Sequence, residues 1–162
     1  DESPWGKKLA YEKMVEAMRT KAEGGDADAM YHLGLSYDHG STGLPKDKKR
    51  ALDWYHRGHE LGNQMCTTGL GCCYADGNGV EQDYAAAVQF YTISAERGSL
   101  YACLKLAKFF AFGRGDMKNA RLADYWFRVM EKIATKDDEG LMRELAPWRN
   151  EVKAMLEDES RA

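Results

Sequence analysis

The sequence is dominated by a pattern of about 36 residues that occurs three times, and internal repetition at this period confines a chain to a few stacked-repeat architectures. The leucines Leu33, Leu70 and Leu106 are 37 and 36 residues apart. An aromatic residue and then a glycine follow each leucine at constant offsets, namely Tyr37, Tyr74 and Phe110, and Gly40, Gly77 and Gly113. Each repeat is therefore expected to form one small unit that buries its apolar face against the next unit.

Each unit predicts two helices, which we call the A helix and the B helix. In the A helix a small residue, a leucine and an aromatic residue recur every four positions, as in Ala29, Leu33 and Tyr37, and so share one helical face. The glycine after the aromatic residue is expected to cap the A helix in the left-handed conformation. The B helices carry the aromatic pairs Trp54-Tyr55, Phe90-Tyr91 and Trp126-Phe127, and are preceded by the N-cap residues Asp47, Asp83 and Asn119.

A glycine in the middle of the A helix gives a packing prediction. Gly34 and Gly71 follow the repeated leucine, and Ala107 takes that place in the third unit. A glycine inside a helix costs about 1 kcal/mol relative to alanine. Because the cost recurs at one position, we expect a neighbouring helix to approach closely there.

The ends of the chain are expected to cap the stack. A helix over residues 7–22 carries an apolar stripe of Tyr11, Met14, Val15 and Met18. After the third unit come Leu141 and Leu145, and then a helix that Pro147 could begin. It carries Trp148, Val152 and Met155.

We therefore predict an all-α fold, a right-handed α/α superhelix (solenoid) of three helix pairs with N- and C-terminal capping helices. The sequence predicts one domain in five segments. They are an N-terminal capping helix over 1–23, repeats over 24–61, 62–97 and 98–133, and C-terminal capping helices over 134–162.

Composition excludes several classes of protein. The chain has 44% hydrophobic and 30% charged residues, which is typical of a globular protein and not of a disordered one. The net charge is −3 with both signs mixed, which disfavours nucleic-acid binding. No stretch approaches the roughly 18 apolar residues of a membrane span, so we expect no membrane insertion. The chain begins at Asp1, which suggests a processed form or a fragment.

The four cysteines, Cys66, Cys72, Cys73 and Cys103, do not recur at a fixed place in each repeat. We interpret them as reduced, mostly buried side chains. That favours a cytoplasmic location, and the endoplasmic reticulum lumen and secretion stay open.

At these repeated residues the chain resembles the Sel-one-like repeat (SLR) family, relatives of the tetratricopeptide repeats. That family's unit carries A-x3-LG-x2-Y, then G-x-G-V-x2-D, then A-x2-WY, and then a glycine. The second unit matches it best, through Leu70, Gly71, Tyr74, Gly77, Gly79, Val80, Asp83, Ala87, Phe90, Tyr91 and Gly98. The resemblance implies stacked antiparallel helix pairs and a role as an adaptor or scaffold. Some bacterial members carry a regular cysteine pair in every repeat, which this chain lacks.

In stacked helix pairs the A helices line the concave face, so their outward side chains are the expected contact surface. We predict that this groove binds a peptide or helix of another protein, because exposed apolar clusters usually mark a partner site. The predicted groove residues are Asp28, Tyr31, Leu35, Asp38, His39, Met65, Thr68, Cys72, Asp76, Tyr101, Leu104, Lys108 and Phe112. The alternative is that several of them are simply core.

Signals for chemistry are weak, and we expect no cofactor, no metal and no enzyme activity. His56 and His59 have the spacing of a metal-binding pair, but no further ligand motif accompanies them, so exposed solubilising histidines are the simpler interpretation. Cys72 could be a nucleophile if it lay near His39.

A basic run, Lys46, Lys48, Lys49 and Arg50, starts the first B helix, either as a contact for an acidic group or as solvated surface. The alternatives to a non-catalytic scaffold are a regulatory or adaptor domain of a larger or membrane-associated protein, and a thiol-dependent enzyme.

Overall fold

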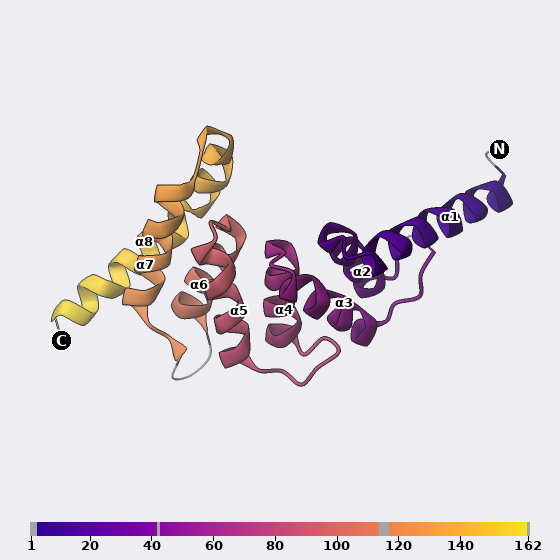
Figure 1. Ribbon diagram of the computed structural model, residues 1–162. Coiled ribbons are helices and arrows are strands. Elements are labelled where there is room, and N and C mark those ends of the chain that lie inside the picture. Colours follow the sequence, from indigo (N-terminus) through magenta and orange to yellow (C-terminus); the bar gives the residue numbers. More distant parts are fainter. Residues whose placement is uncertain (1–2, 42, 114–116, 162) are drawn as a thin grey trace. The chain divides into compact units, whose positions relative to one another are not determined.

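The computed structural model describes residues 3–41, 43–113 and 117–161, and this part of the chain contains helices and turns but no strand (Figure 1). The all-α prediction is confirmed. The elements in chain order are α1 (Pro4–Glu23), α2 (Ala27–His39), α3 (Lys48–Glu60), α4 (Gln64–Asp76), α5 (Tyr84–Glu96), α6 (Leu100–Phe112), α7 (Ala120–Ile133), the 3-10 turn η2 (Lys136–Asp138) and α8 (Glu139–Arg161).

The chain divides into two compact units, Asp1–Phe90 and Tyr91–Ala162. The A helices are α2, α4 and α6, and the B helices are α3, α5 and α7. The repeated leucines Leu33, Leu70 and Leu106 each have 0% of their surface exposed, as core positions of the A helices should.

In the first unit α1 packs on α2, α2 on α3 and α3 on α4, and the two A helices α2 and α4 also touch. Its core holds Leu33, Tyr37, Tyr55, Cys66 and Leu70. In the second unit α6 packs on α7, and α7 packs on α8. Leu106, Phe127, Met130 and Val152 are its largest fully buried side chains.

One backbone hydrogen bond recurs in all three repeats and joins the end of each A helix to the start of the B helix. The N–H of the N-cap residue donates to the carbonyl of the repeated aromatic residue. The pairs are Asp47 to Tyr37 at 2.8 Å, Asp83 to Tyr74 at 2.9 Å and Asn119 to Phe110 at 2.8 Å. The side chains of these N-cap residues accept from the first turn of the B helix, as predicted.

The prediction of a left-handed glycine cap is confirmed twice and wrong once. Gly40 and Gly77 have φ values of 69° and 70°. Gly113 has φ −60° and ψ 165°, which is extended backbone. Helix α6 therefore ends without a left-handed residue. The bond from the Asn119 N–H to the Phe110 carbonyl is still present in the third A–B connection.

The close approach predicted at Gly34 is present. A Cβ added at Gly34 would lie 2.6 Å from Cδ1 of Tyr55, which is inside van der Waals contact. On its other side the same ring faces Gly69 of α4, where a Cβ would lie 3.2 Å from Cδ1. The Tyr55 ring of α3 therefore fits between the two A helices because both present a bare backbone.

The apolar stripe predicted for the N-terminal helix is only partly buried. Val15 is buried and Met18 packs on the core, but Tyr11 and Met14 keep 49% and 41% of their surface exposed. Counting back from the closing glycine, Met14 occupies the register of Ala51 in α3. Ala51 is fully buried where α3 packs on α2, the A helix of its own repeat.

Pro147 does not begin a helix. It lies inside the continuous helix α8, although an interior proline costs about 3 kcal/mol. Leu145 and Val152, on either side of Pro147, are buried, and their packing offsets that cost. A single helix and a 3-10 turn therefore replace the predicted set of C-terminal capping helices.

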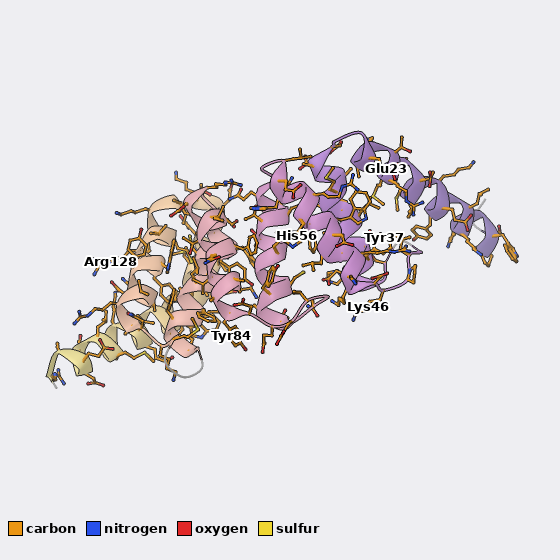
Figure 2. The ribbon with its side chains drawn as sticks, turned by 60° about the horizontal axis from the view of Figure 1, so that its bottom comes forward. Glu23, Tyr37, Lys46, His56, Tyr84 and Arg128 are labelled. Atoms are coloured by element: carbon orange, nitrogen blue, oxygen red, sulfur yellow. The ribbon has the colours of Figure 1, made fainter. Side chains whose placement is uncertain are left out.

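Arg149 of α8 anchors that helix to α7 by charge. It is 9% exposed, pairs with Asp124, and donates to Glu131 at 3.2 Å. Asp124 also pairs with Arg128, a residue of α7 labelled in Figure 2, at 2.7 Å. The buried acid thus has two cationic partners.

We expect Gly34→Ala to destabilise the fold by about 1–3 kcal/mol, because the new methyl group overlaps the buried Tyr55 ring. Gly140→Ala is the matched control, since a Cβ at this helical position in α8 meets nothing within 4 Å. It should leave stability unchanged or raise it by up to about 1 kcal/mol. Urea unfolding followed by circular dichroism measures both, and equal stabilisation by the two changes would contradict the packing described.

Arg149→Met should cost about 1–3 kcal/mol of unfolding free energy, because it leaves Asp124 partly unpaired in a buried position. Adding Asp124→Leu should recover most of the loss, since removing both partners avoids the buried charge. Arg143→Met removes an exposed pair with Glu139 and should change stability by less than about 0.5 kcal/mol. A loss in the double variant as large as that in Arg149→Met would refute the account.

Candidate partner-binding surface

The nine groove residues predicted in the first unit differ in how much surface they present. Four are exposed, namely Asp28, His39, Met65 and Asp76. Four are half-buried, namely Tyr31, Leu35, Asp38 and Cys72. The ninth, Thr68, is only 7% exposed. The prediction that Thr68 belongs to the open surface is therefore wrong. Its short side chain donates a hydrogen bond to the Gln64 carbonyl at 3.0 Å, back along its own helix.

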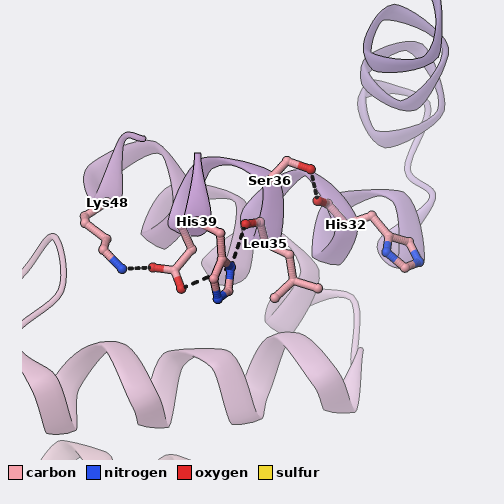
Figure 3. Close-up of polar contacts among 6 residues, drawn as sticks. His32, Leu35, Ser36, His39 and Lys48 are labelled. Atoms are coloured by element: carbon pink, nitrogen blue, oxygen red, sulfur yellow. Dashed lines mark hydrogen bonds and ion pairs between the residues drawn. The ribbon is translucent and has the colours of Figure 1, made fainter. Parts of the chain in front are cut away.

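Asp38 is held by its own chain, through Lys48 and His39, which are labelled in Figure 3. The ammonium of Lys48 lies 2.5 Å from one carboxylate oxygen of Asp38. Nδ1 of His39 donates to the Leu35 carbonyl at 3.0 Å and lies 3.8 Å from the other carboxylate oxygen. A partner that used Asp38 would therefore compete with contacts that already exist.

Asp28 and Tyr31 are likewise engaged. The side-chain amide of Asn63 donates to the Asp28 carboxylate at 2.7 Å. The Tyr31 ring lies 6.2 Å from the Tyr55 ring and packs on the core cluster of the first unit. Tyr31 therefore contributes to stability as well as to the surface, which the sequence had left as an alternative.

In the second unit the four predicted residues lie along α6. Tyr101 and Phe112 keep 49% and 39% of their surface exposed, and Leu104 and Lys108 are half-buried. The Lys108 ammonium lies 3.9 Å from the centre of the Trp148 ring of α8. Phe112 meets the same ring edge to face at 6.1 Å between centroids.

Trp148 and Lys105 belong to this surface but were not predicted as site residues. Lys105 lies on the same side of α6 and places its ammonium 5.1 Å from the Tyr101 ring centre. Trp148 is outside the repeats, so no spacing in the sequence relates it to α6. The signal for Lys105 was available, because it is four residues after Tyr101 and so one turn along the helix.

The sequence suggested that the histidines of α3 are exposed solubilising side chains. This is wrong, because His56 and His59 are both half-buried. His56, labelled in Figure 2, lies 6.3 Å from the ring centres of both Tyr74 and Phe90. His59 meets Phe90 edge to face at 5.3 Å, and its Nδ1 lies 2.9 Å from the Thr67 hydroxyl. Both rings extend an aromatic cluster in which Tyr74 and Phe90 are stacked at 5.4 Å.

Three of the four thiols are buried, whereas Cys72, the one considered as a nucleophile, is half-buried. Among the described residues no group of three or more histidine, cysteine or acidic side chains could hold a metal ion. Burial raises the pKa of Cys66 and of Cys73 to about 12, and that of Cys103 to about 11. These three thiols therefore stay protonated and unreactive near neutral pH.

Two of the four residues in the basic run have partners within the chain. Lys48 pairs with Asp38, and Arg50 pairs with Asp47 at 3.3 Å and lies over the Tyr37 ring. These contacts favour a structural role for half of the run over a dedicated site for an acidic group of a partner.

A cavity of about 690 Å³ in the first unit was not predicted. It lies between α1 and the α2–α3 loop and is lined by Tyr11, Val15, Arg19 and Leu44, among others. The exposed side of Tyr11 forms part of its wall.

Comparison with known proteins identifies the repeats. The Sel1 repeat model matches residues 27–63, 65–99 and 100–129. The chain is 28% identical over 109 residues to the ERAD-associated E3 ubiquitin-protein ligase component HRD3B of Arabidopsis thaliana. The aligned region covers 67% of this chain and 17% of that relative.

Among solved structures, a Sel1 repeat protein from Oxalobacter formigenes matches with a TM-score of 0.67 and 32% identity, covering 76% of this chain and 50% of the other. The c5321 antigen of uropathogenic Escherichia coli, described as having an SLR fold, matches with a TM-score of 0.71 and 20% identity. That alignment covers 95% of this chain and 36% of the other, and it supports the fold alone.

No helix in the described part of the chain is both long enough and apolar enough to cross a bilayer.

Alkylation with iodoacetamide near pH 8 should modify Cys72 first. Cys66, Cys73 and Cys103 are at most 3% exposed, and only about one thiol in a thousand to ten thousand is ionised at that pH for a pKa of about 11 to 12. Mass spectrometry of digested protein gives the sites, and guanidinium chloride should make all four react. Equal labelling of the four thiols in the folded protein would contradict the burial described, and Cys72→Ser should lose the early label.

Proposed function

Because this chain belongs to the Sel1 repeat family, we propose that it is a non-catalytic interaction module that binds a peptide or helix of a partner protein on the surface of its A helices. Sel1 repeat proteins commonly mediate protein–protein interaction and are generally non-catalytic scaffolds. The proposal for this chain concerns which surface does the binding.

The observation that carries the proposal is the exposure of large apolar side chains on helices whose other faces are filled. Met65 of α4 and Tyr101 and Phe112 of α6 keep 51%, 49% and 39% of their surface exposed. The buried faces of α4 and α6 are occupied by Leu70 and Leu106 and their neighbours. Exposed aromatic and methionine side chains are the kinds enriched where proteins bind one another.

The same exposure on the B helix α7 supplies a matched control. Leu122 and Tyr125 are 40% and 54% exposed, much like Phe112 and Tyr101. If exposed apolar area alone decided binding, removal of either pair would have the same effect. The proposal instead assigns binding to Tyr101 and Phe112 of the A helix α6.

A random peptide library displayed on phage tests the assignment. The unmodified chain should enrich peptides. For those that bind at α6, the affinity of Tyr101→Ala/Phe112→Ala should fall by about tenfold or more, a typical loss for two interface aromatics. Leu122→Ala/Tyr125→Ala should retain it. Met65→Ala tests the first unit in the same way. Tyr31 is left unchanged because its ring also packs on Tyr55.

The substituted side chains are exposed, so the melting temperatures of these variants should stay close to that of the unmodified chain. A B-helix variant that loses peptides as fully as the A-helix variant would reject the proposed surface. Failure of the unmodified chain to enrich any peptide would reject the proposed function.

A second candidate is an adaptor domain within a ubiquitin ligase assembly. It is favoured by the similarity to HRD3B, whose name describes a ligase component, although this chain spans only 17% of that relative. Proximity labelling in cells with the chain as bait should then mark ubiquitin ligase subunits, and the marking should weaken with Tyr101→Ala/Phe112→Ala. Labelling without any ligase subunit would exclude this candidate.

A further inference from the structure

The A helix of the second unit differs in charge from the A helices of the first. Within Leu100–Phe112 the only charged residues are Lys105 and Lys108. The helix Ala27–His39 instead contains two aspartates, and Gln64–Asp76 contains one charged residue, Asp76. The α6 patch, which we define as Tyr101, Lys105, Lys108, Phe112 and Trp148, is therefore the one A-helix surface of the described chain whose formal charge is wholly positive.

Both lysines of the α6 patch are held against aromatic rings. The Lys105 ammonium lies 5.1 Å from the centre of the Tyr101 ring, and the Lys108 ammonium lies 3.9 Å from the centre of the Trp148 ring. Cation–π contacts fix the position of a lysine without neutralising it. The positive charges are thus ordered and lie next to exposed apolar surface.

No carboxylate among the described residues pairs with the Lys108 ammonium. Its described contacts are the Trp148 ring and the repulsion from Lys105, with no carboxylate among them. Partial burial and the nearby Lys105 lower the pKa of Lys108 below its usual value. A carboxylate brought to this place would oppose both effects, since an opposite charge favours the protonated amine.

The aromatic rings of the α6 patch set a second requirement for a ligand, which is apolar surface. Phe112 meets Trp148 edge to face at 6.1 Å, and Tyr101 stays half exposed. A ligand that is only anionic would leave these rings in contact with water. The two lysines are three residues apart on the helix, so their spacing suits carboxylates one helical turn apart or on alternate residues of an extended chain.

We propose that the α6 patch binds an acidic segment of a partner protein that also carries apolar side chains. Its carboxylates lie at Lys105 and Lys108, and its apolar side chains pack on the rings of the patch. This inference rests on the proposed function and gives the chemistry of the partner for the second unit.

Single-stranded nucleic acid also combines negative charge with rings that stack on aromatic side chains. Two lysines are few for a phosphate-binding surface, and the net charge of the chain is −3. A protein segment that carries carboxylates fits the charge of this chain better. An oligothymidine of about peptide size serves as the competing probe.

The experiment repeats the displayed-peptide selection with Lys105→Glu/Lys108→Glu. Peptides enriched on the unmodified chain should contain an excess of Asp and Glu together with apolar residues. Their affinity for the charge-reversed variant, measured by fluorescence anisotropy with a synthetic copy, should fall by more than about tenfold, and affinity for the unmodified chain should fall as salt is raised. The variant should enrich basic peptides instead.

Arg121→Glu/Lys132→Glu is the matched control, because it makes the same change in net charge on exposed residues of α7. It should leave the acidic peptides bound. Circular dichroism and melting temperature confirm that both double variants fold, and Lys105→Gln/Lys108→Gln provides a neutral variant with an intermediate loss if charge reversal unfolds the chain.

Enriched peptides without an acidic excess, or peptides bound equally by both double variants, would overturn this inference. The proposed function would survive that result if Tyr101→Ala/Phe112→Ala still abolished binding. Oligothymidine that binds the α6 patch and displaces the peptides would also overturn the inference, in favour of a nucleic acid. A chain that enriches no peptide would overturn the inference and the proposed function together.

Discussion

The structure depends on the complete burial of one leucine in each repeat. Leu33, Leu70 and Leu106 have no exposed surface, and each lies on the buried face of its A helix. Burying a leucine side chain contributes about 2 kcal/mol relative to leaving it in water. Because this contribution recurs about every 36 residues, the same face of every A helix is turned inward, and the opposite face is left for other contacts.

Two backbone features hold that arrangement in register. The bond from the N-cap N–H to the carbonyl of the repeated aromatic residue closes every A–B connection at nearly the same length. In the first unit, bare glycine backbone at Gly34 and Gly69 admits the Tyr55 ring between two A helices. Burial also raises the pKa of the Tyr55 hydroxyl, and the nearby Asp38 carboxylate adds to this, so the ring stays neutral in its site.

The sequence predicted the features that local spacing controls. Helix caps at Asp47, Asp83 and Asn119, the buried leucines and the contact at Gly34 all follow from offsets within one repeat.

The errors arise where residues distant in the sequence determine the local structure. Pro147 stays within a helix because packing on both sides of it outweighs a local preference. His56 and His59 are drawn into an aromatic cluster by Tyr74 and Phe90, which belong to the next repeat. Trp148 joins the α6 surface from a helix that follows no repeat.

The account divides each repeat into a buried seam and an A-helix surface that binds a partner. Amide hydrogen–deuterium exchange on the chain with and without a bound peptide tests this division most directly, since it reports protection segment by segment. We expect slower exchange in peptic fragments of the A helices, Gln64–Asp76 or Leu100–Phe112, with B-helix fragments such as Ala120–Ile133 unchanged. Protection confined to the B helices would contradict the account.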